Sequence, residues 1–280
     1  NSIEAINKST WSEKWAEYRK RPGSFIMFIF VHLATLITVL SIGFLLVYVL
    51  VKGIPNLNAD IFSWEYTSDN CSLVPALINT VYMTLLSLLI AGPIGIFAAI
   101  YLVEYAKTGN KLVGVVRITA ETLTGIPSIV YGLFGMLFFT NACGLRLSLI
   151  SGALTLAIMV LPVIMRTTEE ALMAVPKSYR EGSFGLGAGK LRTVFKVVLP
   201  SAVPGILSGI ILATGRIVGE TAALIYTAGS VAKMATKLTD STRTLTVHMY
   251  LLSKEGLHTD QGYATAVVLL VLVVLINFAS

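Results

Sequence analysis

The chain has 280 residues, of which 55% are hydrophobic and only 13% are charged, and its mean hydropathy is +0.79. Soluble domains carry roughly a quarter charged residues, so this composition excludes a soluble protein and indicates an integral membrane protein. The net charge of +6 does not indicate a nucleic-acid partner, because an excess of Lys and Arg also sets the orientation of membrane proteins. Two cysteines indicate neither a Cys-rich zinc site nor a disulfide framework.

The first segment, residues 1–24, is polar and basic, and we expect it to be a cytoplasmic N-terminal segment. Trp11, Trp15 and Tyr18 recur at helical spacing, which favours a short helix at the membrane interface. A frayed tail is the equally weighted alternative.

Six apolar runs follow, and each is long enough to cross a bilayer. They define a transmembrane domain over residues 25–280 and predict an all-α fold with six membrane helices. The second run contains Gly92-Pro93-Ile94-Gly95 and the third contains Gly125-Ile126-Pro127, so both are expected to bend or break there. The runs are Phe25–Val51, Leu73–Val103, Ile118–Thr140, Ser148–Met165, Ala202–Thr227 and Tyr263–Ser280.

The basic residues predict the orientation of these spans. With the N-terminus in the cytoplasm, the inner segments hold fourteen Lys and Arg residues and the outer segments hold six. The remaining one, Arg216, lies inside a span. Cytoplasmic loops carry the excess of Lys and Arg, so the sequence predicts a cytoplasmic N-terminus.

This orientation places a long loop, residues 229–262, on the outer side. Its apolar residues between Leu245 and Leu252 could dip into the outer leaflet. A loop of this length usually has a function or structure of its own. His248 and His258 lie in it without Cys or carboxylate partners at ligand spacing, so no metal site is expected.

Cys71 precedes the second span and Cys143 follows the third, which places both on the outer side. Disulfides persist outside the cytosol, so a bridge between two outer loops is one interpretation. Two unpaired thiols are the other, since their separation cannot be read from sequence.

Between the fourth and fifth spans lies a polar connector, the coupling element 176–199. Pro176 suits the first turn of a helix that continues to Leu186, and Gly187 is a natural stop. A second helix, Lys190–Val198, is expected to end at Leu199-Pro200 and to bury Leu191, Val194, Phe195 and Val198 on one face. The pattern fits a docking element for a soluble partner or a helical hairpin on the membrane.

The spacing within this connector resembles the EAA loop of ABC importer permeases. That loop reads Glu-Ala-Ala, three residues, Gly, nine residues, Ile-x-Leu-Pro, and here the same spacing carries Glu181-Gly182-Ser183, Gly187 and Val197-Val198-Leu199-Pro200. Gly182 and Ser183 replace the two alanines, which could loosen the first helix. The resemblance implies that Glu181, Gly182, Ser183, Gly187, Leu199 and Pro200 couple this chain to an ATP-binding subunit.

Longer strings, among them GRIVGETAALIYTAG and ETLTGIPSIVYGLFG, are similar to permease subunits of bacterial phosphate importers. They favour the A-type over the sister C-type subunit. This resemblance implies a type I permease of the bacterial cytoplasmic (inner) membrane, paired with a C-type sister permease. It also implies two ATP-binding subunits, which hold ATP and Mg, and an external phosphate-binding protein. No cofactor is expected on this chain itself.

The fifth span carries a charge pair. Arg216 and Glu220 are spaced i and i+4 and should lie one above the other on a helix. One interpretation is that they neutralise each other at a helix interface. The other is that Arg216 meets the phosphate anion, because its planar fork matches phosphate oxygens, while Glu220 holds or releases it. Two small-residue pairs, Gly205/Gly209 and Gly215/Gly219, predict close helix packing.

Arg166, at the inner end of the fourth span, is a second candidate for the anion pathway. It could equally anchor the span or pair with Glu169 or Glu170. Arg117 and Glu121, also i and i+4, are expected to form a structural pair.

The sequence contains no G-x-x-x-x-G-K-[ST] phosphate loop, so ATP hydrolysis by this chain is not expected. An ion-coupled secondary transporter should show an internal inverted repeat, and none is clear. An intramembrane enzyme would need a convergent acid, base or metal cluster, for which Arg216 and Glu220 are a poor set. A permease for a different oxyanion remains an alternative.

Overall fold

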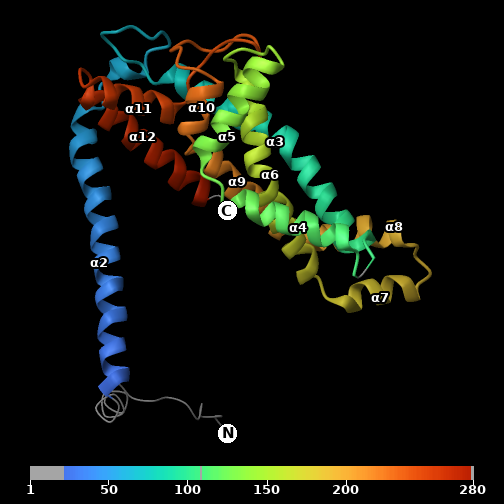
Figure 1. Ribbon diagram of the computed structural model, residues 1–280. Coiled ribbons are helices and arrows are strands. Elements are labelled where there is room, and N and C mark those ends of the chain that lie inside the picture. The colour runs from blue at the N-terminus through green and yellow to red at the C-terminus, as the bar shows by residue number, and fades with distance from the viewer. Residues whose placement is uncertain (1–21, 108, 279–280) are drawn as a thin grey trace. The chain divides into compact units, whose positions relative to one another are not determined.

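The computed structural model describes residues 22–107 and 109–278, and every regular element in these ranges is helical (Figure 1). The chain divides into two compact units, Asn1–Val51 and Lys52–Ser280. Most of α2 (Pro22–Gly53) makes up the described part of the first unit. This apolar helix of 32 residues exceeds the ~20 that a bilayer requires. Trp11, Trp15 and Tyr18 lie outside the described residues.

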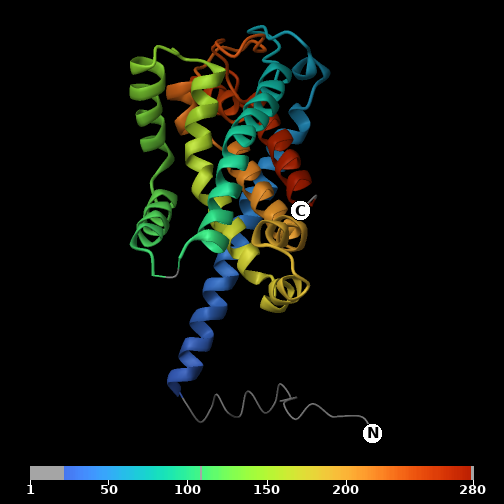
Figure 2. The same ribbon diagram turned by 90° about the vertical axis from the view of Figure 1, so that its right-hand side faces the viewer.

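The second unit is built around three long helices. After two short 3-10 turns, η1 (Ile54–Asn56) and η2 (Ala59–Phe62), come α3 (Val74–Ile100) and later α6 (Leu149–Ala174) and α9 (Leu199–Val218). Helix α6 packs against both α3 and α9 and is the most buried of the candidate spans (Figure 2). Its apolar core includes the fully buried side chains of Met83, Leu156, Met159, Ile164 and Ile217.

The third span is broken, as Gly125-Ile126-Pro127 predicts. Helix α4 (Lys111–Thr124) and helix α5 (Ser128–Gly135), which continues as the π-helical turn η4 (Met136–Ala142), meet at an angle of 103°. The amide of Gly125 bonds back to Thr122, and Pro127 starts α5 with its φ near −58°. Proline suits a helix start because it lacks the amide that would be unpaired there.

The second span is not broken at Pro93. Helix α3 runs through this proline and ends in a π-helical turn, η3 (Tyr101–Tyr105). Helix α6 lies directly against α3 beside this proline, because a Cβ on Gly95 would meet Ile164 at 3.0 Å. Cover from a neighbouring helix is what allows a proline inside a membrane helix.

The connector forms α7 (Lys177–Gly185) and α8 (Lys190–Thr193), and α8 continues through the π-helical turn η5 (Val194–Val198) into α9. The expected end at Leu199-Pro200 is therefore wrong: Lys190–Val218 is one helical run of 29 residues. The π-helical turn shifts the hydrogen-bond ladder just before Pro200, so the missing proline amide falls where the α-helical pattern is already interrupted.

Away from the connector, helix α10 (Ala222–Thr227), the loop that follows it, α11 (Leu245–Glu255) and the first turns of α12 (Thr259–Phe278) form the opposite end of the second unit. We call the two ends the connector end and the opposite end. The side chains of Leu245, Val247 and Leu252 are buried within the protein. The expectation that this apolar cluster dips into lipid is therefore wrong.

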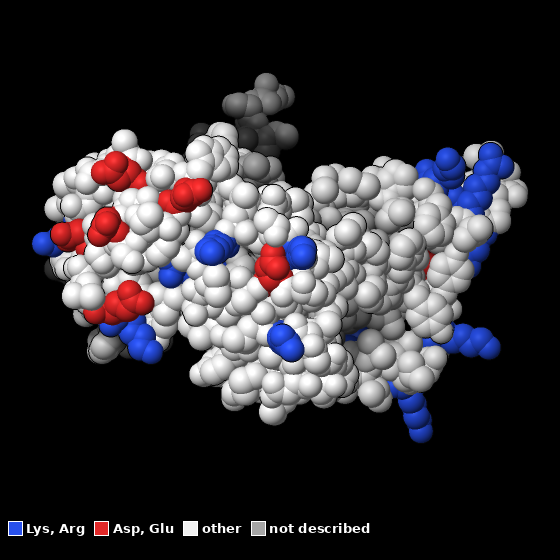
Figure 3. Space-filling model, turned by 90° about the horizontal axis from the view of Figure 1, so that it is seen from above, with Lys and Arg blue, Asp and Glu red and all other residues white. Residues whose placement is uncertain are grey.

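Among the described residues, five helices are long and apolar enough to cross a membrane, and the bent α4–α5 pair makes a sixth span if it crosses as one. Charges are unevenly distributed over this fold (Figure 3). Acidic side chains gather over residues 57–73 and the α11–α12 junction, and basic ones over the connector. The exposed acidic residues are Asp60, Glu65, Asp69, Glu255 and Asp260, and the exposed basic ones are Lys107, Lys177, Lys190, Arg192 and Lys196.

Candidate functional site

The connector forms two short helices around a left-handed turn. Helix α7 begins after Pro176, and the chain reverses at Gly187, whose φ is +82°. Only glycine adopts this conformation readily, so Gly187 ends the helix as the sequence indicates. The amide of Gly187 bonds to Phe184 and that of Ala188 to Ser183, which closes the turn.

Apolar side chains of the connector point into solvent. Leu186 is 91% exposed and Leu191 is 67% exposed. Of the four residues expected on one buried face, Val194 and Val198 are buried, but Leu191 and Phe195 are exposed. Exposed apolar side chains clustered on one element mark an interaction surface.

Ser183 ties the two connector helices together. Its hydroxyl lies 2.8 Å from the hydroxyl of Thr193 on α8, a contact that the alanine of the EAA pattern could not make. The expected loosening is therefore offset at this position. Glu181 and Gly182 are exposed, and Glu181 makes no ion pair within the described ranges.

Arg216 lies in the last turn of α9, where α9 and α10 are separated by a short break. Its side chain is half-buried and makes no hydrogen bond or ion pair with a described residue. The hydroxyl of Tyr131, on the neighbouring broken span, lies within range of an electrostatic interaction with the Arg216 guanidinium. Helix α5, which follows the first break, packs directly against α10, which follows the second, because a Cβ on Gly132 would meet the backbone of Ala223 at 2.8 Å.

Arg216 and Glu220 do not pair, so the interpretation that they neutralise each other is wrong. Helix α9 ends at Val218, so the i to i+4 spacing is not continued as a helix. The Glu220 carboxylate is buried and instead accepts the amide of Ala223 at 3.0 Å, which caps the first turn of α10. The Glu220 carbonyl accepts the hydroxyl of Thr246 at 2.7 Å. Glu220 therefore holds the break in place.

The two glycine pairs of α9 have different surroundings. A Cβ on Gly205 would meet the Cβ of Ala171 at 2.6 Å, and one on Gly209 would meet the Oγ1 of Thr167 at 2.1 Å. These glycines therefore allow close contact with α6. Gly215 has nothing within 4 Å, and Gly219 meets only its own helix, so this pair makes no such contact within the described chain.

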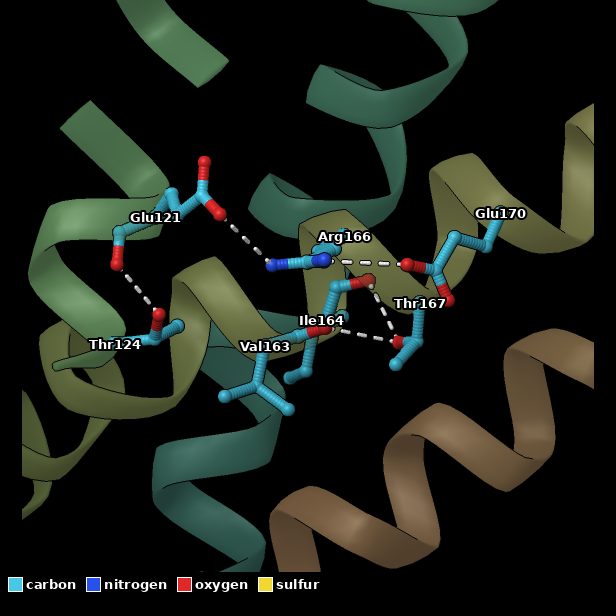
Figure 4. A network of polar contacts seen from close by, with 7 residues as sticks. All are labelled: Glu121, Thr124, Val163, Ile164, Arg166, Thr167 and Glu170. Atoms are coloured by element: carbon cyan, nitrogen blue, oxygen red, sulfur yellow. Dashed lines mark hydrogen bonds and ion pairs between the residues drawn. The ribbon is translucent and has the colours of Figure 1, made fainter. Parts of the chain in front are cut away.

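Arg166 lies in a charged network between α4 and α6 (Figure 4). Its Nε donates to Glu170 at 3.2 Å, and its Nη1 lies 3.8 Å from Glu121. Arg117 pairs with Glu169, so the expected Arg117–Glu121 pair does not form. The break after α4 turns this helix across α6, which brings these partners together. The network lines a cavity of about 250 Å³ with Ala120, Met165 and Met173.

Sequence reasoning missed a fourth ion pair, Glu104–Arg180. Arg180 lies on α7 beside Glu181, and Glu104 lies in the turn η3 at the end of α3. The pair is mostly buried, with side-chain exposures of 18% for Arg180 and 9% for Glu104. The sequence shows Arg180 next to the EAA-like motif and Glu104 at the end of the second span. It contains no signal that pairs these two residues, which are 76 positions apart.

Cys71 and Cys143 are both free, which agrees with two unpaired thiols rather than with a bridge. Cys71 is buried, and burial raises the pKa of its thiol. Cys143 is exposed. In the described part of the chain no three His, Cys, Asp or Glu residues lie close enough to hold a metal ion.

The sequence matches a family model described as "Binding-protein-dependent transport system inner membrane component" over residues 91–280. The probable ABC transporter permease protein YqgI of Bacillus subtilis (strain 168) is 38% identical over 203 residues, covering 70% of this chain and 67% of that protein. The phosphate transport system permease protein PstA of Xylella fastidiosa (strain 9a5c) is 40% identical over 179 residues, covering 63% and 62%. The PstA homolog of Mycoplasma pneumoniae (strain ATCC 29342 / M129 / Subtype 1) is 33% identical over 256 residues, but the match spans only 39% of its length.

Solved structures share the fold. A chain of a bacterial alginate ABC transporter, solved in complex with an alginate pentasaccharide-bound periplasmic protein, matches with a TM-score of 0.66 at 15% identity over 93% of this chain and 96% of its own. A chain of the inward-facing MetNI methionine ABC transporter matches with a TM-score of 0.59 at 23% identity, covering 74% and 92%. Together with the family model, these similarities show that the chain belongs to the inner membrane components of binding-protein-dependent transport systems, the permease subunits of ABC importers.

Proposed function

We propose that this chain forms half of the translocation pathway of an ATP-driven importer of inorganic phosphate. The observation that carries the proposal is Arg216, a half-buried arginine in a membrane span that no described carboxylate neutralises. A charge inside a span is expensive and is by default functional. Similarity to proteins named as phosphate permeases supports phosphate as the anion.

The surroundings of Arg216 fit an anion pathway. Arg216 lies beside the break between α9 and α10, and the helix that follows this break packs against α5, the second half of the broken third span. Interrupted helices are typical of membrane transport sites, because they leave backbone groups free to face the substrate. The guanidinium offers a planar fork to phosphate oxygens and stays charged at any physiological pH.

The connector supports coupling to ATP hydrolysis in a separate subunit. Its exposed Leu186 and Leu191 provide an apolar surface for a soluble partner, with Glu181 and several basic side chains around it. In the proposed assembly, a sister C-type permease completes the pore, two ATP-binding subunits bind ATP and Mg, and an external phosphate-binding protein delivers the anion. Closure of the ATP-binding subunits pushes the connector, and the continuous helix from α8 to α9 carries that motion to Arg216.

The charge distribution supports an orientation in the bacterial cytoplasmic membrane. Basic side chains gather over the connector end and acidic ones over the opposite end (Figure 3). Since Lys and Arg favour the cytoplasm, the connector end and the N-terminus face inward in the proposed topology. Arg166 then lies at the inner mouth of the pathway, where its loose 3.8 Å contact with Glu121 can open to let the anion pass.

The test is phosphate uptake by proteoliposomes that contain the purified complex with its partner subunits. The variant Arg216→Gln should lower uptake at least a hundredfold while the partner subunits still co-purify. Arg216→Lys should retain a small part, because it keeps the charge without the fork. Arg146→Gln is the matched control, since Arg146 is exposed and lies outside the spans.

Uptake that persists in Arg216→Gln would make Arg216 a structural residue only. ATP turnover by the complex distinguishes the anions. ATP turnover that rises when phosphate and its binding protein are added supports the proposal. If turnover rises with another oxyanion and not with phosphate, that oxyanion is the substrate instead.

A further inference from the structure

The side chain of Arg180 joins three elements at the connector end. It extends from α7, and its Nε and Nη2 donate to Oε1 of Glu104 at 3.0 and 2.7 Å. Its Nη2 also donates to the carbonyl of Leu172 and its Nη1 to the carbonyl of Val175, each at 2.9 Å. Glu104 belongs to the end of α3, and the two carbonyls to the end of α6.

These contacts are strong for a residue near the surface. The side chains of Arg180 and Glu104 are only 18% and 9% exposed, so solvent and salt screen the pair less than an exposed one. A cation is also favoured at a helix C-terminus, and here it reaches the carbonyls of Leu172 in the last turn of α6 and of Val175 just after it. The guanidinium therefore satisfies a carboxylate and two carbonyls at once.

The rest of α7 is held weakly. None of its residues is buried, and its neighbours are mainly α8 and η5, the other parts of the connector. The Ser183–Thr193 hydrogen bond also stays within the connector. Since packing does not fix α7 against the membrane core, its position relative to α3 and α6 depends on Arg180.

We propose that Arg180, bound to Glu104, is a positioning residue that makes α7 move as one body with the ends of α3 and α6. The inference rests on the proposed function of the connector as the element that receives motion from an ATP-binding subunit. Motion then reaches the membrane core by two routes. One is the continuous helix from α8 to α9, and the other is the Arg180–Glu104 contact.

The first experiment measures coupling in the complete complex in proteoliposomes. Arg180→Gln and Glu104→Gln should each lower phosphate uptake at least tenfold while ATP hydrolysis stays within about twofold of the unchanged complex. The double variant should be no worse than either single one, because both remove the same contact. Arg180→Lys should be intermediate, since a lysine keeps the charge but not the fork. Arg146→Gln is again the control.

Parallel losses of uptake and ATP hydrolysis, or additive losses in the double variant, would overturn the inference and leave the pair a stabilising contact only.

The second experiment does not depend on the transported anion. Nitroxide labels on unnatural side chains at the exposed positions Tyr101 and Lys177 report the distance between the end of α3 and α7. This distance should stay the same with and without trapped nucleotide, and should shift or broaden in Arg180→Gln. If trapped nucleotide changes this distance by the same amount in the unchanged protein and in Arg180→Gln, the inference is overturned. If the complex shows no phosphate-stimulated turnover, the proposed function fails while this distance still tests the contact.

Discussion

At the opposite end, one buried amide joins segments far apart in sequence. Asn79 of α3 donates to the carbonyls of Lys233 and Arg243, at 2.9 and 3.3 Å, and accepts the amide of Ala235 at 2.9 Å. At the connector end, the Arg166–Glu170 pair has side chains that are 56% and 60% exposed. Buried hydrogen bonds to backbone are costly to leave unmade, whereas exposed ion pairs exchange partners with little penalty. The opposite end is therefore built to stay fixed, whereas the exposed ion pairs of Arg166 at the connector end can rearrange.

The largest expected effect tests the fixed end. Asn79→Ala leaves the carbonyl of Arg243 and the amide of Ala235 without partners at a fully buried position, and it removes one of the two bonds to the carbonyl of Lys233. Each unsatisfied buried group costs about 1–3 kcal/mol, so the free energy of unfolding should fall by about 3 kcal/mol. Denaturant titration of the purified subunit in detergent measures it. The control Asn277→Ala removes an exposed bond within one helix and should change stability by less than about 0.5 kcal/mol. Equal effects of the two variants would contradict the comparison.

A smaller effect comes from pH. Burial, reinforced by the charge of Arg243, lowers the pKa of His248 from 6.5 to about 3, and a backbone contact with Cys71 offsets only part of this. Between pH 6.5 and 3, His248 is protonated in the unfolded chain and neutral in the folded one. The free energy of unfolding is therefore highest above pH 6.5 and falls as the pH drops toward 3. At pH 5.5 the loss should be about 1.4 kcal/mol.

Unfolding titrations at pH 7.5 and 5.5 measure this loss. His248→Gln should remove about 1.4 kcal/mol of the difference between the two pH values, whereas His258→Gln should keep it. An unchanged pH dependence in His248→Gln would mean that His248 is protonated in the folded protein.

The smallest effect is expected at the connector end. Arg166→Gln removes an exposed pair at 3.2 Å and a looser one at 3.8 Å, so the free energy of unfolding should change by less than about 1 kcal/mol. The same titration measures it beside Asn79→Ala. A loss as large as that of Asn79→Ala would show that the ion pairs of the connector end are as rigid as the buried hydrogen bonds.

The spans and one of their breaks could be predicted from sequence, because long apolar runs and a Gly-Ile-Pro turn act locally. The same local reasoning was wrong at Pro93 and Pro200. At Pro93, a neighbouring helix keeps α3 intact across the proline. At Pro200, a π-helical turn makes room for it. Both depend on the surroundings rather than on the residue itself.

The candidate site was predictable in its motif and not in its partners. Gly187 has the positive φ that its place in the pattern requires. Glu220 is in sequence an ideal partner for Arg216, yet it caps α10, because α9 ends two residues earlier. Arg180 finds Glu104 across 76 residues only once α3, α6 and α7 have packed. Residue spacing along a helix predicts side-chain pairs within that helix, but it does not predict pairs between different helices, which form only when the chain folds.

The continuous helix from Lys190 to Val218 acts as a lever with unequal arms. One close contact with α6 is at Gly209, where a Cβ would overlap the side chain of Thr167. At 1.5 Å per residue, the arm toward Lys190 is about 28 Å long and the arm toward Arg216 about 10 Å. If the helix tilts about Gly209, a 5 Å displacement of the connector moves Arg216 by about 2 Å in the opposite direction. Travel of that size cannot carry an anion across a membrane, but it is enough to make or break the hydrogen bonds that hold one.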